Sequence, residues 1–205
     1  MERAIATIAV VASGIIQPFG GIAVLLWTRW SGTPLAAIGY CAPRRPLLAI
    51  GAAIALGIGL KLVMKAIVLP LLSAPPTNAA YQGLVGNPAL LPSLVFASIV
   101  AGGFGEETYW RGFLFERMGK LLGTGPAAIL ATISLTSLLF AAHHYFDQGL
   151  PGVEQAVFTG FVFGAMFLRM KTLWPVMAAH AAFDLTAVAI IYAGFEEPIA
   201  HLVFR

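Results

Sequence analysis

Long apolar stretches make up most of the chain, and short segments rich in proline, glycine and charge separate them. A helix that crosses a bilayer needs about 20 mostly apolar residues. Six stretches meet this requirement: residues 4–27, 47–72, 91–115, 126–146, 153–168 and 173–192. The alternation of apolar and polar residues that marks membrane β-strands is absent from the sequence. The pattern therefore predicts an all-α, polytopic transmembrane helix bundle of about six spans.

Basic residues between these stretches predict the orientation, because Lys and Arg concentrate in cytoplasmic loops. If all six stretches cross, seven basic residues fall on one side: Arg29, Arg44, Arg45, Arg117, Lys120, Arg169 and Lys171. This places both termini outside the cytoplasm. The apolar run at 4–27 is longer than a signal-peptide core and follows residues with no net positive charge, which favours an uncleaved span over a signal peptide.

Composition supports a membrane protein. Of 205 residues, 59% are hydrophobic and 10% are charged, whereas soluble domains carry about 25% charged residues. Disorder requires low hydrophobicity and high charge, the reverse of this composition. One cysteine excludes an internal disulfide and a cysteine-cluster metal site. A net charge of +3 without a basic run gives no indication of nucleic-acid binding.

Ionisable side chains inside predicted spans are the candidate functional residues, because each costs several kcal/mol in lipid. There are nine: Lys61, Lys65, Glu106, Glu107, Arg111, His143, His144, His180 and Asp184. Glu107 and Arg111 are four residues apart, with the acid first, which favours an ion pair on one helix face. Glu106 points about 100° away from that face and is the candidate general base. The alternative is that all three form a structural ion-pair cluster.

Two further pairs lie four residues apart on later spans. Phe140 and His144 share one face, while His143 is rotated away and is interpreted as a polar residue that binds a neighbouring helix. Asp184 can accept the imidazole N–H of His180 and fix its tautomer. Together, three helices supply the residue types that activate and position a water molecule, by general base or through a metal.

Two other pairs are given no catalytic role. Lys61 and Lys65 share one face of the second span and either line a cavity or extend towards the outer surface. Gly160 and Gly164 predict a face of close helix packing.

These pairs resemble the motifs of the CPBP family, which comprises CAAX prenyl endopeptidases and Abi-type bacteriocin-processing intramembrane proteases. The family motifs EExxxR, FxxxH and HxxxN or HxxxD are matched by Glu106-Glu107-x-x-x-Arg111, Phe140-x-x-x-His144 and His180-x-x-x-Asp184. The resemblance covers roughly residues 92–190. It implies a catalytic core at 91–195 and accessory transmembrane helices at 1–90 in one membrane-embedded unit.

The resemblance implies an intramembrane endopeptidase with four catalytic residues. Glu106 would act as the general base and hold the attacking water with His144. His180, with Asp184, would stabilise the oxyanion of the tetrahedral intermediate. The CAAX endopeptidases have Asn at the last position, so Asp184 must be protonated to donate a hydrogen bond, or it orients His180 instead. Three supporting residues complete the set: Glu107, Arg111 and Phe140.

The family includes both metalloproteases and metal-independent glutamic proteases. We favour the glutamic mechanism without a cofactor, because the sequence has no HExxH and no two histidines four apart on one helix. Zinc bound by Glu106, His144 and His180 is the alternative, since catalytic zinc commonly has three protein ligands and water.

The expected partners are the lipid bilayer and a membrane-anchored or hydrophobic peptide or protein substrate, without nucleic acid. The small chain suits a multi-pass protein of a prokaryotic cell (inner) membrane. One alternative function is a non-catalytic membrane regulator or immunity-type scaffold, although every motif position is present. A small transporter is the other, and it would spread its polar residues along a path.

The depth of His144 conflicts with simple spans. At about 1.5 Å per residue, His180 lies about 10 Å and His144 about 27 Å from the same side of the bilayer. A shared site therefore predicts a fourth span that begins below the bilayer, a segment 145–152 that dips inwards, or a misplaced span.

Overall fold

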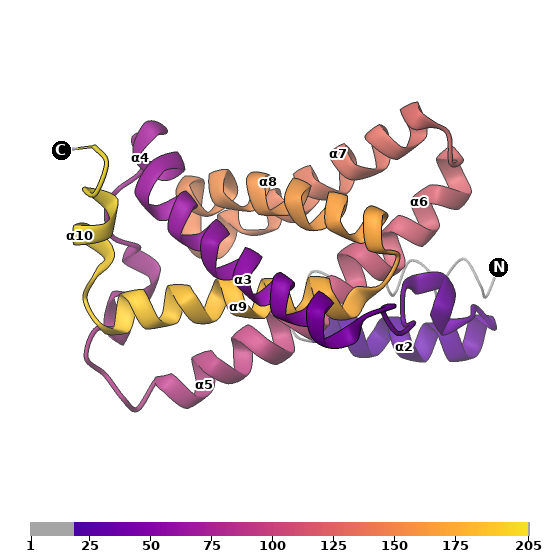
Figure 1. The fold of residues 1–205 in the computed structure, drawn as a ribbon, viewed down its shortest axis with the longest axis horizontal. Helices are drawn as coiled ribbons and strands as arrows, with labels where there is room; N and C mark the ends of the chain where they lie inside the picture. The colour runs from indigo at the N-terminus through magenta and orange to yellow at the C-terminus, as the bar shows by residue number, and fades with distance from the viewer. Residues whose placement is uncertain (1–18, 205) are drawn as a thin grey trace.

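The computed structural model describes residues 19–204, and every regular element in that range is a helix (Figure 1). The elements follow in chain order: α2 (Phe19–Ser31), η1 (Leu35–Ile38), α3 (Pro46–Val63), η2 (Met64–Val68), α4 (Leu69–Leu71), η3 (Ala79–Leu84), α5 (Leu91–Phe96), η4 (Ala97–Glu106), η5 (Thr108–Leu114), α6 (Phe115–Leu122), α7 (Pro126–His143), α8 (Tyr145–Met170), α9 (Leu173–Tyr192) and α10 (Glu196–Ala200). The all-α prediction is confirmed for these residues.

Four helices of the described chain are long and apolar enough to cross a membrane: 46–71, which joins α3, η2 and α4, and α7, α8 and α9. They match four of the six predicted spans, as expected for a multi-pass membrane protein. The predicted span at 91–115 is helical as α5, η4 and η5 but is not one of the four. Most of the predicted span at 4–27, and with it the choice between span and signal peptide, lies outside the described residues.

Prolines and glycines set several helix boundaries. Pro46 and Pro126 begin α3 and α7, where a missing backbone N–H breaks no helical bond. Gly149 has φ 64° and ψ −158°, so it interrupts α8 just before Pro151. Residues 145–148 therefore form a short helical turn that follows α7 almost directly. Segment 145–152, whose inward dip was one of three explanations for the depth of His144, is a kinked helix start.

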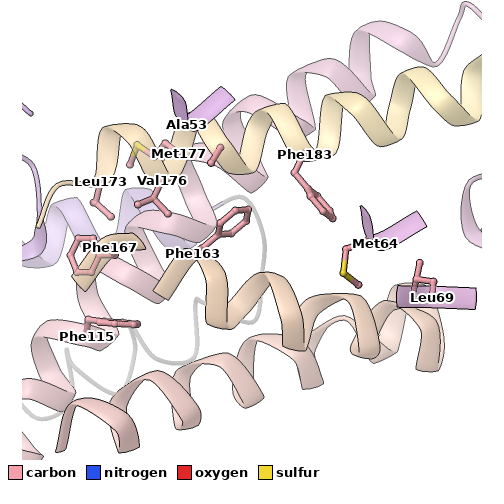
Figure 2. Close-up of a cluster of buried hydrophobic side chains, with 11 residues drawn as sticks. Ala53, Met64, Leu69, Phe115, Phe163, Phe167, Leu173, Val176, Met177 and Phe183 are labelled. Atoms are coloured by element: carbon pink, nitrogen blue, oxygen red, sulfur yellow. The ribbon is translucent and has the colours of Figure 1, made fainter. Parts of the chain in front are cut away.

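Helix α9 lies at the centre of the packing. It contacts α3 most extensively and also packs against η4 and α8, and Figure 1 shows α3 crossing it, with the α7–α8 pair alongside. Figure 2 shows the larger buried hydrophobic cluster, to which α3, α8 and α9 all contribute. Its members include Ala53, Met64, Phe163, Phe167, Val176, Met177 and Phe183. This core fixes α9, the helix that carries His180 and Asp184.

Small residues allow the helices to approach closely. A Cβ atom on Gly57 of α3 would lie 2.1 Å from the Ala179 carbonyl oxygen of α9. A Cβ atom on Gly160 of α8 would lie 2.9 Å from the Ser137 side chain of α7, and one on Gly164 would lie 3.2 Å from Phe115. The predicted close-packing face of α8 is confirmed.

We expect Gly57→Ala to destabilise the protein by about 1–3 kcal/mol, because the methyl group meets backbone that cannot rotate away. Gly59→Ala is the matched control, since a Cβ atom there meets nothing within 4 Å. Thermal unfolding of both variants in the same detergent measures the difference. Equal midpoints for the two variants would contradict this account of the α3–α9 contact.

Candidate active site

The helix that carries the two adjacent glutamates is wider than an α-helix. Both η4 and η5 are π-helical, with backbone bonds from residue i to i+5. Glu106 and Glu107 stand where they meet and face different surroundings. Glu106 lines a cavity, whereas Glu107 is wholly buried in the packed interior. The same helical segment thus places the Glu106 carboxylate in the cavity and the Glu107 carboxylate in the packed core.

Glu107 joins Arg111 to His180. Its Oε1 atom accepts a hydrogen bond from Arg111 Nη1 at 2.8 Å and from His180 Nδ1 at 2.6 Å. The predicted Glu107–Arg111 pair is confirmed. The structure differs from the sequence analysis in the group that orients His180, because Asp184 Oδ2 lies 3.6 Å from Nε2. The ring is therefore held at one nitrogen by Glu107 and faces Asp184 with the other.

Arg111 is buried between aromatic rings. Its guanidinium carbon lies 4.5 Å from the centre of the Phe140 ring and 5.6 Å from that of Phe163. Nη2 donates to the Gly160 carbonyl at 3.4 Å. The Glu107 carboxylate and the two aromatic rings stabilise the guanidinium charge, which burial removes from water. Arg111 thereby ties η5 to α7 and α8.

The tautomer of His144 follows from its backbone contact. His144 Nδ1 lies 2.9 Å from the Phe140 carbonyl oxygen, which can only accept, so Nδ1 carries the proton. In the neutral ring, Nε2 is then an acceptor. The Phe140 ring centre lies 4.6 Å from the His144 ring and 6.1 Å from the His180 ring. Both imidazoles therefore lie near the same Phe140 ring, although helix rise predicted different depths for them.

The four residues expected to be catalytic line one cavity of about 810 Å³: Glu106, His144, His180 and Asp184. His180 Nε2 lies 3.8 Å from Glu106 Oε2 and faces Asp184 as described. A Cβ atom on Gly102 would lie 2.6 Å from Asp184 Oδ2 and 3.5 Å from His180 Nε2. A glycine at 102 thus leaves space for these groups. His143 also lines the cavity, beside the Trp110 ring.

Lys61 and Lys65 line the same cavity, so the cavity interpretation holds and extension to the outer surface is wrong. Lys61 Nζ donates to Gln155 Oε1 at 2.7 Å. Lys65 Nζ donates to Glu196 Oε1 at 2.8 Å and to the Pro76 carbonyl at 2.6 Å. The two lysines therefore have different partners, one neutral and one charged.

Glu196 also lines the cavity. Besides Lys65, its carboxylate accepts from the Asn78 backbone N–H at 3.0 Å and from Gln82 Nε2 at 2.9 Å. Residues of segment 75–84, Tyr81 among them, line the cavity beside it. These bonds hold segment 75–84 and α10 beside the cavity. Figure 1 shows α10 at the left of the molecule, below α4.

Sequence reasoning missed Gln155, Gly102, Glu196 and segment 75–84. Gln155 had a usable signal, because it is a polar residue inside the predicted span 153–168. The doublet Gly102-Gly103, one turn before Glu106, was a second signal. Glu196 and segment 75–84 lie outside every predicted span, and only the tertiary fold brings them to the cavity.

Within residues 19–204, no three His, Cys, Asp or Glu side chains are grouped so as to hold a metal ion. Glu106, His144 and His180 therefore do not form a preformed zinc ligand set in this arrangement.

Residues 88–186 match the model of a protein family described as type II CAAX prenyl endopeptidase, Rce1-like. This segment is just under half of the 205 residues and contains every motif position from Glu106 to Asp184. Neither the curated proteins nor the solved structures contain a match.

We expect Arg111→Met to destabilise the protein by about 3–5 kcal/mol, because it leaves the buried Glu107 carboxylate without its cation. Arg44→Met is the matched control, since Arg44 is exposed between helices. Thermal unfolding in detergent checks both variants. A loss no larger than that of the control would show that Arg111 does not hold the bundle together.

Proposed function

Because residues 88–186 form a type II CAAX prenyl endopeptidase family domain, we propose that the protein is an intramembrane endopeptidase of the glutamic type. It hydrolyses a peptide bond of a membrane-anchored or hydrophobic peptide or protein. Glu106 is the general base, and His144, His180 and Asp184 act with it. The observation that carries this proposal is the convergence of these four side chains on one cavity inside a membrane-helix bundle.

Glu106 and His144 activate the water in this mechanism. The Glu106 carboxylate accepts one proton of the water, and His144 Nε2 accepts a hydrogen bond from the other O–H. His144 can accept there because the Phe140 carbonyl holds the ring proton on Nδ1. The water oxygen then attacks the peptide carbon. The protonated Glu106 finally gives its proton to the leaving amine as the carbon–nitrogen bond breaks.

His180 stabilises the oxyanion that forms in this attack. Its Nδ1–H donates to Glu107, so a protonated ring presents Nε2–H to the cavity. The carboxylates of Glu106, Glu107 and Asp184 surround the ring and favour its cationic form. Preorganised donors of this kind are worth several kcal/mol of transition-state stabilisation. Asp184, at 3.6 Å, stabilises the imidazolium as a carboxylate and does not need to donate a proton.

Glu107, Arg111 and Phe140 position these groups without touching the substrate. Glu107 fixes the ring of His180, and Arg111 fixes Glu107. Phe140 supplies the backbone carbonyl that sets the tautomer of His144. The cavity is also lined by apolar side chains such as Phe163 and Phe183, which suits a hydrophobic peptide segment. A substrate anchored in the same membrane reaches such a cavity most readily.

We expect Glu106→Gln to lower the rate of peptide cleavage by about 100-fold or more, because the amide cannot accept the proton of the water. Glu197→Gln is the matched control, since Glu197 is exposed on α10. Cleavage of a panel of acylated fluorescent peptides is measured in detergent and in nanodiscs, with and without a strong chelator.

A rate that survives chelation but is lost in Glu106→Gln supports the glutamic mechanism. Loss on chelation with recovery on adding zinc would overturn it and move Glu106 and the histidines to ligand roles. Cleavage at the wild-type rate by Glu106→Gln would show that Glu106 is not the base.

A further inference from the structure

Lys61 is a buried cation that the proposed chemistry does not use. Its side chain lines the cavity and is only 8% exposed. Its Nζ atom donates to Gln155 Oε1 at 2.7 Å and lies 5.0 Å from the centre of the Phe183 ring. Both contacts are with neutral groups. Burying an ammonium group is costly unless a negative charge accompanies it.

The other charged groups of the cavity are already engaged or lie further away. Lys65 pairs with Glu196. Glu106 and Asp184 both face His180 Nε2. Asp147 is exposed at the start of α8. Among residues 19–204, no carboxylate lies within ion-pair distance of Lys61. Asp184 and Glu196 act on Lys61 only at longer range, so Lys61 brings to the cavity a positive charge without a direct ion pair.

The Lys61–Gln155 contact creates a cluster of hydrogen-bond donors. The ammonium group can only donate, so the atom that faces it is the amide oxygen, and the amide NH2 of Gln155 is turned away. The ammonium retains two N–H groups beyond the one given to Gln155. The remaining ammonium N–H groups and the NH2 on the other side of the Gln155 amide are donors suited to the acceptor oxygens of a carboxylate.

We propose that Lys61 and Gln155 form a subsite that binds a carboxylate of the substrate peptide, either its terminal α-carboxylate or an acidic side chain. This inference rests on the proposed peptidase function and adds a specificity determinant to it. The bound anion supplies the direct ion pair that Lys61 lacks.

The fold places this subsite near the proposed cleavage position. The Phe183 ring that Lys61 covers follows His180 by three residues on α9, a rise of about 4.5 Å. The two sites are also joined through rings, since Phe163 lies 5.2 Å from His180 and 6.4 Å from Phe183. An extended peptide advances about 3.3 Å per residue. The carboxylate therefore lies within a few residues of the scissile bond.

Binding tests the subsite separately from cleavage. The Glu106→Gln protein, in phosphatidylcholine nanodiscs, is titrated into an acylated fluorescent peptide made with a C-terminal acid or a C-terminal amide. A third peptide carries the amide and one internal glutamate. We expect the acid or the glutamate peptide to bind about 10- to 100-fold more tightly than the plain amide, as for a charge-assisted hydrogen bond. Which of the two does so identifies the source of the carboxylate.

Adding Lys61→Met should remove this preference and leave binding of the amide peptide within about threefold. Lys61→Arg should retain part of it, because the charge remains. Lys65→Met is the matched control, since it removes a cavity lysine that is already paired. Thermal unfolding of each variant reports whether it folds. If Lys61→Met does not fold, Gln155→Leu provides a second test of the subsite.

Equal binding of all three peptides by the parent protein overturns the subsite, even if wild type cleaves them. An equal loss for acid and amide peptides in Lys61→Met also overturns it and shows that Lys61 supports the structure or Asp184. Acid-selective binding without cleavage by wild type would instead count against the proposed peptidase function and leave the subsite standing.

Discussion

A single buried carboxylate oxygen organises the centre of this protein. Glu107 Oε1 accepts from Arg111 and from His180, which joins the π-helical segment to α9. Through its contacts with Phe140, Phe163 and Gly160, Arg111 extends the connection to α7 and α8. The orientation of His180 therefore depends on an ion pair that no substrate needs to touch. Removing either partner would leave an uncompensated charge in the core.

Two adjacent glutamates face different surroundings at the junction of two π-helical segments. Glu106 lines the cavity and Glu107 is buried in the core, because neighbouring residues on a helix point about 100° apart. Wide turns of this kind are frequent at functional sites. The small residue Gly102 on the same segment leaves room for Asp184 and His180. The segment therefore contributes both a carboxylate and the space that the neighbouring side chains of α9 need.

Much of the architecture was predictable because lipid imposes simple rules. Long apolar stretches predicted six spans, and four of them are helices long and apolar enough to cross a membrane. Spacing of four residues predicted the Glu107–Arg111 pair. The partner of His180 was missed because Glu107 is 73 positions away in the chain. Spacing along one helix reveals only pairs within that helix. For this reason the sequence analysis assigned the orientation of the His180 ring to Asp184, one turn away. Helix rise gave different depths to His144 and His180 because it treats each helix as perpendicular to the bilayer, whereas membrane helices are commonly tilted.

The spacing of the two cavity lysines has a consequence for how the cavity works. Lys61 and Lys65 lie one turn apart on a continuous helix, and Lys65 is bonded to the Glu196 that holds segment 75–84 in place. A shift of Lys61 along this helix would therefore also move Lys65 and its bond to Glu196. One turn of helix, about 5.4 Å, carries one lysine with a charged partner and one lysine with a neutral partner. The charge that lines the cavity therefore changes over one helical turn, from a paired ammonium beside segment 75–84 to an ammonium without a direct ion pair.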